Sequence, residues 1–401
     1  MANNNNKDKC NVPNLRFPEF SGEWVTKSIN DLAVVIGGGT PDTTVKSYWD
    51  GEIQWFTPSE IGKNKYVDSS LRTITEVGLN NSSAKLLPPN TILLSSRATI
   101  GECSLSLREC ATNQGFQCLV SKKCNVDFLY YLIQTKKKDL IRKSCGSTFL
   151  EISANEVRKI QVSVPSDVEQ QKIAELLSLI DERIATQNKI IDKLKSLIKG
   201  LPHKMAEIGL QKGCWEKVLL STVLVERKEL NSELYTVHSV SVSEGVINQI
   251  EYLGRSFAAK DTSNYHVARY GDIIYTKSPT GDFPYGIVKQ SYIEQPVAIS
   301  PLYGVYSPTS FETGVYLHYY FMSSVLAKNY LYPLIQKGAK NTINISNQRF
   351  LENRIALPLK QTDRHNIARA LITIQKKLDI EKCAMDSLTK QRSYLLQQLF
   401  I

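Results

Sequence analysis

IAELLSLIDERIATQNKIIDKLKSLIKGLPHKM, residues 173–205, is the stretch that decides the fold. Its apolar residues recur at alternating intervals of four and three, and residues 367–399, IARALITIQKKLDIEKCAMDSLTKQRSYLLQQL, repeat that spacing in the same register. A stripe of two residues in seven predicts two long helices, each pairing with another helix along a narrow seam. The predicted helix-pairing seam consists of Ile173, Leu177, Ile180, Ile184, Ile191, Leu194 and Leu201 in the first helix and Ile367, Leu371, Ile374, Leu378, Leu388 and Leu395 in the second.

The two helices are expected to pair with each other in antiparallel orientation. At about 1.5 Å per residue, each makes a rod of about 50 Å, which is the length of a spacer. Antiparallel pairing would place the sequence before each helix at opposite ends of the rod, related by a pseudo-twofold axis.

The repeat extends upstream of the helices. The segments IQVSVP (160–165) and NRIALP (353–358) each predict a short strand that a proline ends, directly before a helix. Farther back, TILLSSRATIG (91–101) matches DIIYTKSPTG (272–281). The predicted fold is therefore mixed α/β (α+β), with two globular domains separated by two long antiparallel coiled-coil helices. The expected boundaries are an N-terminal segment 1–22, domain 23–164, helical region 165–205, linker 206–214, domain 215–357 and helical region 358–401.

Composition sets broad limits on function. Lys and Arg number 49 against 39 Asp and Glu, and the net charge of +10 is compatible with nucleic-acid binding without requiring it. No secretory signal and no apolar run long enough to span a membrane can be recognised, so a cytoplasmic location without a membrane partner is expected. The spacing of the 8 cysteines and 5 histidines fits no metal-binding motif, and we expect reduced, mostly buried thiols and no bound metal.

The motifs of self-contained catalysis are not recognisable. The run Gly37-Gly38-Gly39-Thr40 has no following lysine and predicts a turn rather than a phosphate loop. Pro88-Pro89 lacks the flanking residues that an adenine methyltransferase uses to hold the amino group, and predicts a loop. A nuclease site built from Asp42, Glu60 and Glu102 is an alternative, although solvated surface carboxylates explain them better. A coiled-coil scaffold that binds other proteins is the second alternative.

Basic residues supply the candidate DNA contacts. Arg97 and Lys277 each end an apolar strand and open a glycine-containing loop, from which such side chains reach a DNA groove. A second group precedes the turn at 146–148, and a sparser group precedes Asn341-Thr342. These groups are Lys136, Lys137, Lys138, Arg142 and Lys143, and Lys337 and Lys340. Surface ion pairs and solvated helix faces are the alternative explanation, and Tyr130 and Tyr319 are expected in the core.

The chain resembles the specificity subunit of type I restriction-modification systems over nearly its whole length. The motifs that carry the resemblance are VPNLRFPEFSGEW (12–24), GGGTPDTTVKSYWDGEIQWFTPSEI (37–61), LLSSRATIGE (93–102), TNQGFQCL (112–119), GSTFLEIS (146–153) and VPSDVEQQKIAELLSLIDERI (164–184). The resemblance implies that two target-recognition domains each read one half of a split site in double-stranded DNA. It also implies that the helices dock two methyltransferase subunits, and that restriction subunits complete the complex.

The resemblance implies that this chain is not an enzyme and binds no cofactor, while its partner subunits use S-adenosylmethionine, ATP and magnesium. The second domain departs from the pattern, since it lacks the GGTP…YW signature and has TDRHNIARAL where the first helix has VEQQKIAELL. Individual base contacts therefore cannot be transferred to residues 215–357.

Overall fold

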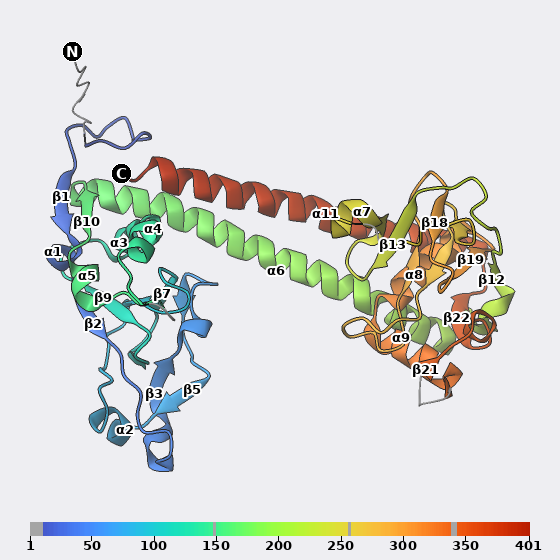
Figure 1. Ribbon diagram of the computed structural model, residues 1–401, viewed down its shortest axis with the longest axis horizontal. Coiled ribbons are helices and arrows are strands. Elements are labelled where there is room, and N and C mark those ends of the chain that lie inside the picture. The colour runs from blue at the N-terminus through green and yellow to red at the C-terminus, as the bar shows by residue number, and fades with distance from the viewer. Residues whose placement is uncertain (1–10, 147–149, 256–257, 338–342) are drawn as a thin grey trace. The chain divides into compact units, whose positions relative to one another are not determined.

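The computed structural model describes residues 11–146, 150–255, 258–337 and 343–401, which form two compact units (Figure 1). Unit 1 consists of Met1–Gln187 and Ala384–Ile401, and unit 2 of Asn188–Cys383. Two long helices, α6 (Asp167–Gln211) and α11 (Gln361–Gln398), each contribute to both units. No helix in the described part of the chain is long and apolar enough to cross a membrane.

Unit 1 contains a five-stranded sheet in the order β2-β9-β6-β7-β4, a three-stranded sheet in the order β5-β3-β8, and the antiparallel pair β1-β10. The strands are β1 (Val25–Ser28), β2 (Ala33–Gly37), β3 (Trp49–Phe56), β4 (Tyr66–Val67), β5 (Arg72–Ile74), β6 (Ile92–Leu94), β7 (Cys103–Ser106), β8 (Cys110–Thr112), β9 (Gln117–Ser121) and β10 (Gln161–Val164). The short helices are α1 (Ile29–Leu32), α2 (Glu76–Asn80), α3 (Val126–Thr135), α4 (Lys137–Arg142) and α5 (Ala154–Arg158), with 3-10 turns η1 (Lys46–Tyr48) and η2 (Pro58–Glu60).

Unit 2 contains two four-stranded sheets, ordered β12-β19-β16-β17 and β14-β13-β18-β15, and the pairs β11-β22 and β20-β21. The strands are β11 (Trp215–Leu219), β12 (Leu224–Glu226), β13 (Val237–Ser241), β14 (Gly245–Asn248), β15 (His266–Ala268), β16 (Ile273–Tyr275), β17 (Val288–Gln290), β18 (Val297–Ile299), β19 (Gly304–Pro308), β20 (Gln336–Lys337), β21 (Ile343–Asn344) and β22 (Arg354–Pro358). The helices are α7 (Gln249–Leu253), α8 (Phe311–Phe321), α9 (Ser324–Leu331) and α10 (Asn347–Phe350), with 3-10 turns η3 (Leu220–Thr222) and η4 (Tyr332–Leu334).

The predicted mixed α/β class and its internal repeat are confirmed by these elements. β10 and β22 are the strands predicted before Pro165 and at Pro358, and each pairs antiparallel with the strand that opens its domain. Trp215 pairs with Pro358 in the second pair, and Val25 with Val164 in the first. The start and end of each domain therefore meet at the point where a long helix begins.

The predicted linker 206–214 is wrong for residues 206–211, because α6 continues to Gln211. The prediction ends the helix near Pro202, but this proline lies inside the helix and does not end it. The turn after Gln211 contains Gly213, whose φ of +68° is unfavourable for other residues. The amide of Cys214 then donates to the carbonyl of Gly209 at 3.1 Å and closes the last turn.

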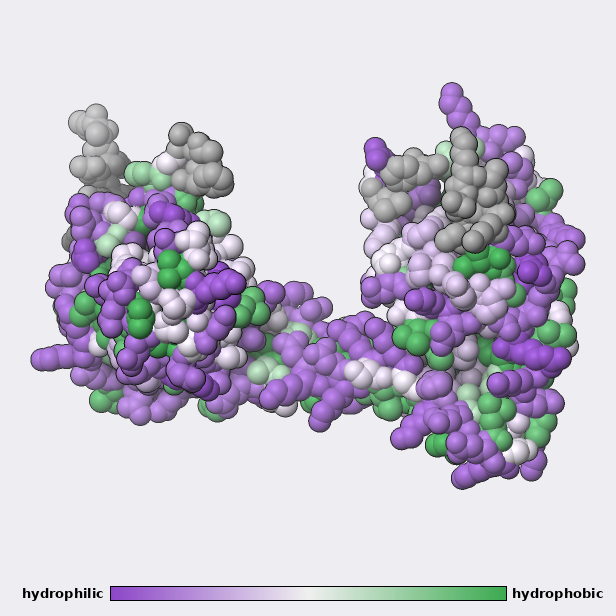
Figure 2. All heavy atoms as spheres, turned by 90° about the horizontal axis from the view of Figure 1, so that it is seen from below, coloured by the Kyte–Doolittle hydropathy of each residue, from purple (hydrophilic) through white to green (hydrophobic). Residues whose placement is uncertain are grey.

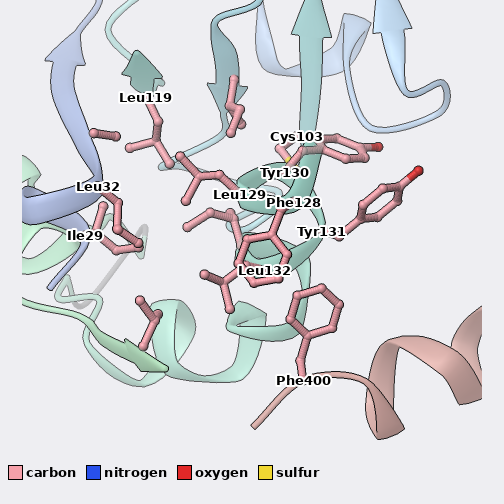
Figure 3. Close-up of a cluster of buried hydrophobic side chains, with 14 of the residues drawn as sticks. Ile29, Leu32, Cys103, Leu119, Phe128, Leu129, Tyr130, Tyr131, Leu132 and Phe400 are labelled. Atoms are coloured by element: carbon pink, nitrogen blue, oxygen red, sulfur yellow. The ribbon is translucent and has the colours of Figure 1, made fainter. Parts of the chain in front are cut away.

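Every residue of the predicted seam is buried or half-buried. In unit 1 the seam does more than pair two helices, because Ile173, Leu177 and Ile180 share one core cluster with Phe128 and Leu395. Figure 3 shows part of this cluster, with Phe400 from the end of the chain beside Phe128, their ring centroids 5.2 Å apart. The beginning of α6 therefore packs with the end of α11, which is the antiparallel arrangement within this unit.

The expectation of mostly buried thiols holds for only part of the cysteines. In the described residues Cys103, Cys110 and Cys118 are buried, and burial raises the pKa of each thiol to about 12. Cys124 is half-buried, whereas Cys145, Cys214 and Cys383 are exposed. Cys145 and Cys214 lie outside the helices, and Cys383 lies on an exposed face of α11.

Candidate DNA interface

Arg97 lies in the loop that follows β6 in unit 1. Its Nε is 2.8 Å from Oε1 of Glu151, and both side chains remain about two-fifths exposed, at 43% and 37%. The backbone next to Arg97 is fixed, because the amide of Ile152 donates to the carbonyl of Ser96 at 3.1 Å, and Ser96 is itself buried. Arg97 therefore extends from a rigid base with its charge at the surface.

Lys137, at the start of α4, lies against the same loop. It forms an ion pair with Glu102, and a Cβ added at Gly101 would be 2.8 Å from Cγ of Lys137. The side chain of Lys137 is 46% exposed. Arg97 and Lys137, which are far apart in the sequence, thus border one surface loop.

The other members of the predicted basic group do not join this loop. Lys136 is half-buried, burial lowers its pKa, and its ammonium group donates to the backbone carbonyl of Ile401, so it is occupied within the fold. Arg142 pairs with Asp139 one helical turn away on the exposed side of α4. Within the described part of the chain, Lys138 and Lys143 have no ion pair. The single basic cluster expected around 136–143 is therefore dispersed, because a helix directs neighbouring residues to different sides.

Lys277 occupies the corresponding loop of unit 2, directly after β16. It is half-buried, and this burial lowers the pKa of its ammonium group. The negative charge of Glu226 on β12 raises the same pKa by a smaller amount. Glu226 also accepts a hydrogen bond from Nδ2 of Asn347 at 2.7 Å. Lys340, the turn at Asn341-Thr342 and most of the turn at 146–148 lie outside the described residues, as does the side chain of Lys337.

Arg97 and Lys277 leave equivalent strands. β6 lies between β9 and β7 in the order β2-β9-β6-β7, and β16 lies between β19 and β17 in the order β12-β19-β16-β17. In both sheets the central strand pairs antiparallel with its two neighbours. The internal repeat thus places one cation at the same point of both sheets.

The carboxylates of the nuclease alternative do not converge. Asp42 accepts from the amide of Thr44 at 2.9 Å, Glu60 accepts from the amide of Leu71 at 2.7 Å, and Glu102 pairs with Lys137. Among the residues that the structure describes, no three His, Cys, Asp or Glu side chains come close enough together to hold a metal ion. These acids stabilise separate loops.

Sequence reasoning missed the acidic partners of the basic residues. Glu102 and Glu151 neutralise Lys137 and Arg97 respectively. Glu102 lies in the segment LLSSRATIGE together with Arg97 but pairs with Lys137, and Glu151 lies in GSTFLEIS, which contains no basic residue, so the sequence carried no signal for either pair. The surface of both units in Figure 2 is mainly hydrophilic with scattered hydrophobic residues.

Residues 21–196 match the family model described as the type I restriction modification DNA specificity domain. The match covers less than half of the chain. A stretch of 180 residues is 39% identical to the type I restriction enzyme MjaIX specificity subunit of Methanocaldococcus jannaschii and covers 43% of this chain and 42% of that protein. The EcoR124I/EcoR124II specificity subunit of Escherichia coli is 31% identical over 199 residues, which cover 48% of this chain and 46% of that protein. The matches thus span less than half the length of these relatives.

The fold of the whole chain is similar to that of a solved structure, the type I restriction-modification system S subunit from M. genitalium. The TM-score is 0.58 at 16% sequence identity, and the match covers 97% of this chain and 99% of the other. At this identity the similarity concerns the fold, and it includes the second unit, most of which the family match leaves out.

Proposed function

We propose that this chain is the DNA sequence-recognition subunit of a type I restriction-modification complex. Domains 23–164 and 215–357 each bind one half of a bipartite, asymmetric site in double-stranded DNA. The observation that carries the proposal is the repeated sheet with Arg97 and Lys277 at equivalent positions, in a chain whose first half matches the specificity domain family.

The ion pairs of unit 1 fit this role. Arg97–Glu151 and Lys137–Glu102 are exposed pairs, and such pairs contribute only about 0–1 kcal/mol to stability. A DNA phosphate or base edge therefore replaces the glutamate at little cost. When DNA is absent, the glutamates limit non-specific attraction to the duplex.

The proposed division of labour leaves chemistry to the partners. Methyltransferase subunits dock on the helical regions 165–205 and 358–401 and bring S-adenosylmethionine, while restriction subunits bring ATP and magnesium. This chain contributes the choice of sequence, and it works in the bacterial cytoplasm, where chromosomal DNA is accessible.

The test is to express the chain with the methyltransferase subunit from the same genome in a host that lacks adenine methylation. We expect methylated adenines at one bipartite sequence, which disappear when this chain is omitted. The same preparation of the chain alone should neither methylate nor cut DNA. Chain-independent methylation, or methyl transfer by the highly purified chain, would contradict the proposal.

A further inference from the structure

Tyr285 and Tyr332 form an aromatic pair in unit 2. Their ring centroids are 6.1 Å apart, with the ring planes tilted by 43°. Tyr332 is 63% exposed, and Tyr285 is half-buried. Within the described part of the chain, neither phenol hydroxyl has a hydrogen-bond partner. Tyr332 thus presents its ring to solvent, with the half-buried ring of Tyr285 next to it.

Tyr285 is held by the same hairpin that carries Lys277. The amide of Thr276 donates to the carbonyl of Ile287 at 2.9 Å, and the hydroxyl of Tyr275 donates to the carbonyl of Tyr285 at 2.8 Å. Gly286 has a φ of +96°, and a Cβ there would lie 1.7 Å from the carbonyl oxygen of Thr276. The hairpin therefore closes tightly, with Tyr285 and Lys277 on its two opposite arms.

Tyr332 is held from the other side. It begins the 3-10 turn η4 directly after α9, and Leu334 in the same turn is buried, with only 5% of its surface exposed. Pro333 fixes the backbone between them. Keeping the large ring of Tyr332 exposed on rigid backbone, next to a second, half-buried ring, gives up hydrophobic stabilisation, which indicates a surface built for contact.

The equivalent place in unit 1 has different chemistry. α4 follows α3 as α9 follows α8, and each is followed by a strand-like pairing, Cys145↔Glu151 in unit 1 and β20-β21 in unit 2. Unit 1 carries cations along α4, including Lys137, and Lys143 directly follows that helix, at the position where Tyr332 follows α9. The two domains therefore differ in chemistry at matching positions.

We propose that Tyr285 and Tyr332 contact the DNA half-site of unit 2, with their rings packed against sugar and base edges. The inference rests on the proposed function. DNA is the occupant that fits, because Tyr285, whose ring contacts that of Tyr332, lies on the same hairpin as Lys277, the one candidate cation of this unit whose side chain the structure describes. Aromatic rings give a contact with nucleotides that does not depend on net charge, unlike lysine on phosphate.

The experiment uses the full chain assembled with its methyltransferase subunits and a labelled duplex that contains the mapped methylation site. Affinity is measured at several salt concentrations for the wild type, Tyr332→Ala, Tyr332→Phe and Tyr332→Asp. Tyr252→Ala is the matched control, because Tyr252 is an exposed tyrosine on α7 of the same unit. Thermal unfolding midpoints establish that each variant is folded.

We expect Tyr332→Ala to bind at least about fivefold more weakly, with the slope of log affinity against log salt unchanged. Tyr332→Phe should stay within about twofold of the wild type, and Tyr332→Asp should bind more weakly than the alanine variant, because its charge repels the duplex. Tyr252→Ala should match the wild type.

Two results would overturn the inference while leaving the proposed function intact. One is specific binding by the wild type together with unchanged binding by Tyr332→Ala and Tyr332→Asp. The other is loss of methyltransferase assembly in Tyr332→Ala, which would assign the pair to a protein partner. If the wild-type complex does not bind the site specifically, the proposed function is wrong, and the inference that rests on it is wrong as well.

Discussion

At the scale of single residues, Arg97 and Lys277 occupy equivalent places but differ in what they can recognise. Arginine presents a planar fork of donors that matches the two acceptors of guanine, whereas lysine acts as a point charge. Arg97 is held by a carboxylate at the surface, and Lys277 is half-buried near Glu226. We therefore expect the two residues to make different kinds of contact.

Arg97→Ala should relax one base position and cost about 1–3 kcal/mol of specific binding. Lys277→Ala should weaken binding to all sequences together and lower the slope of log affinity against log salt by about one unit. Titrations of the assembled complex with matched and single-base-changed duplexes at several salt concentrations measure both effects. Arg108→Ala is the control, because Arg108 forms an exposed pair with Asp68 and not with a residue of either loop. If both substitutions leave affinity, slope and preference unchanged, these loops do not face DNA.

His318 gives unit 2 a sensitivity to acid. Its Nδ1 accepts a hydrogen bond from the amide of Gln290 at 3.0 Å, and burial, with a smaller effect of Lys289, lowers its pKa to about 3. The unfolded chain takes up a proton near pH 6.5, but the folded chain does not until about pH 3. Stability is therefore lost progressively as the pH falls below about 6.5.

His318→Asn keeps an acceptor for Gln290 and removes the titrating group. Between pH 7 and pH 5 the wild type should lose up to about 2 kcal/mol more stability than this variant, measured from urea unfolding of unit 2 at each pH. His203→Asn, at an exposed position on α6, is the control and should keep the wild-type dependence. Equal loss of stability with falling pH in all three proteins would show that folding does not lower the pKa of His318.

At the scale of elements, the ion pair between Asp181 of α6 and Arg392 of α11 stands where the apolar seam is interrupted. Nε of Arg392 is 2.5 Å from Oδ1 of Asp181, and both side chains are mostly buried, at 21% and 16% exposure. The hydroxyl of Tyr131 donates to Oδ2 of Asp181 at 2.7 Å, and Nη2 of Arg392 donates to Oε1 of Gln134 at 3.0 Å. The pair thus ties both helices to α3.

Arg392→Met should destabilise unit 1 by about 3 kcal/mol, because it leaves Asp181 buried without its counter-charge. Adding Asp181→Asn should restore most of this loss, since an uncharged amide still accepts from Tyr131. Urea unfolding of the single and double variants measures the difference. Lys195→Met removes a loose, exposed pair with Asp192 on the same helix and should change stability by less than about 0.5 kcal/mol. A double variant no more stable than Arg392→Met would rule out the unpaired charge as the cause.

The elements also show what sequence reasoning can reach. Helices and strands followed from hydrophobic spacing, because the period of a pattern is a local property of the chain. The partner of Lys136 could not be predicted, since Ile401 arrives from the far end of the sequence. The pairing of Arg97 with Glu151 depends on loop geometry, which has no periodic signal. For the same reason, the aromatic pair of Tyr285 and Tyr332 became visible only in the structure.

At the scale of the whole molecule, the repeat predicts that the helices set the gap between half-sites. Seven residues inserted into α6 after Gln187 and seven into α11 after Cys383 keep the seam in register at the division between the units. The added length of about 10 Å should lengthen the preferred gap by at most about three base pairs. Mapping methylated adenines measures the gap, and an unchanged spacing would mean that the helices are not a ruler.

The two domains should also recognise DNA independently of each other. Because domains 23–164 and 215–357 differ in sequence while both end in the same strand pairing, each should bind its own half-site through its own loops. Replacing 23–164 by the equivalent domain of a related protein should change one half of the methylated sequence and leave the other intact. A change in both halves would show that the domains read DNA jointly.

The way the core of unit 1 is completed has a consequence for the order in which the molecule is made. Leu395, Leu399 and Phe400 belong to that core, yet the ribosome adds them after every residue of unit 2. Unit 2 is one contiguous segment, so all of its residues have been synthesised while unit 1 still lacks the residues from Ala384 onward. During translation the nascent chain therefore carries an open apolar surface on its older half, and the half made second is the first that can finish folding.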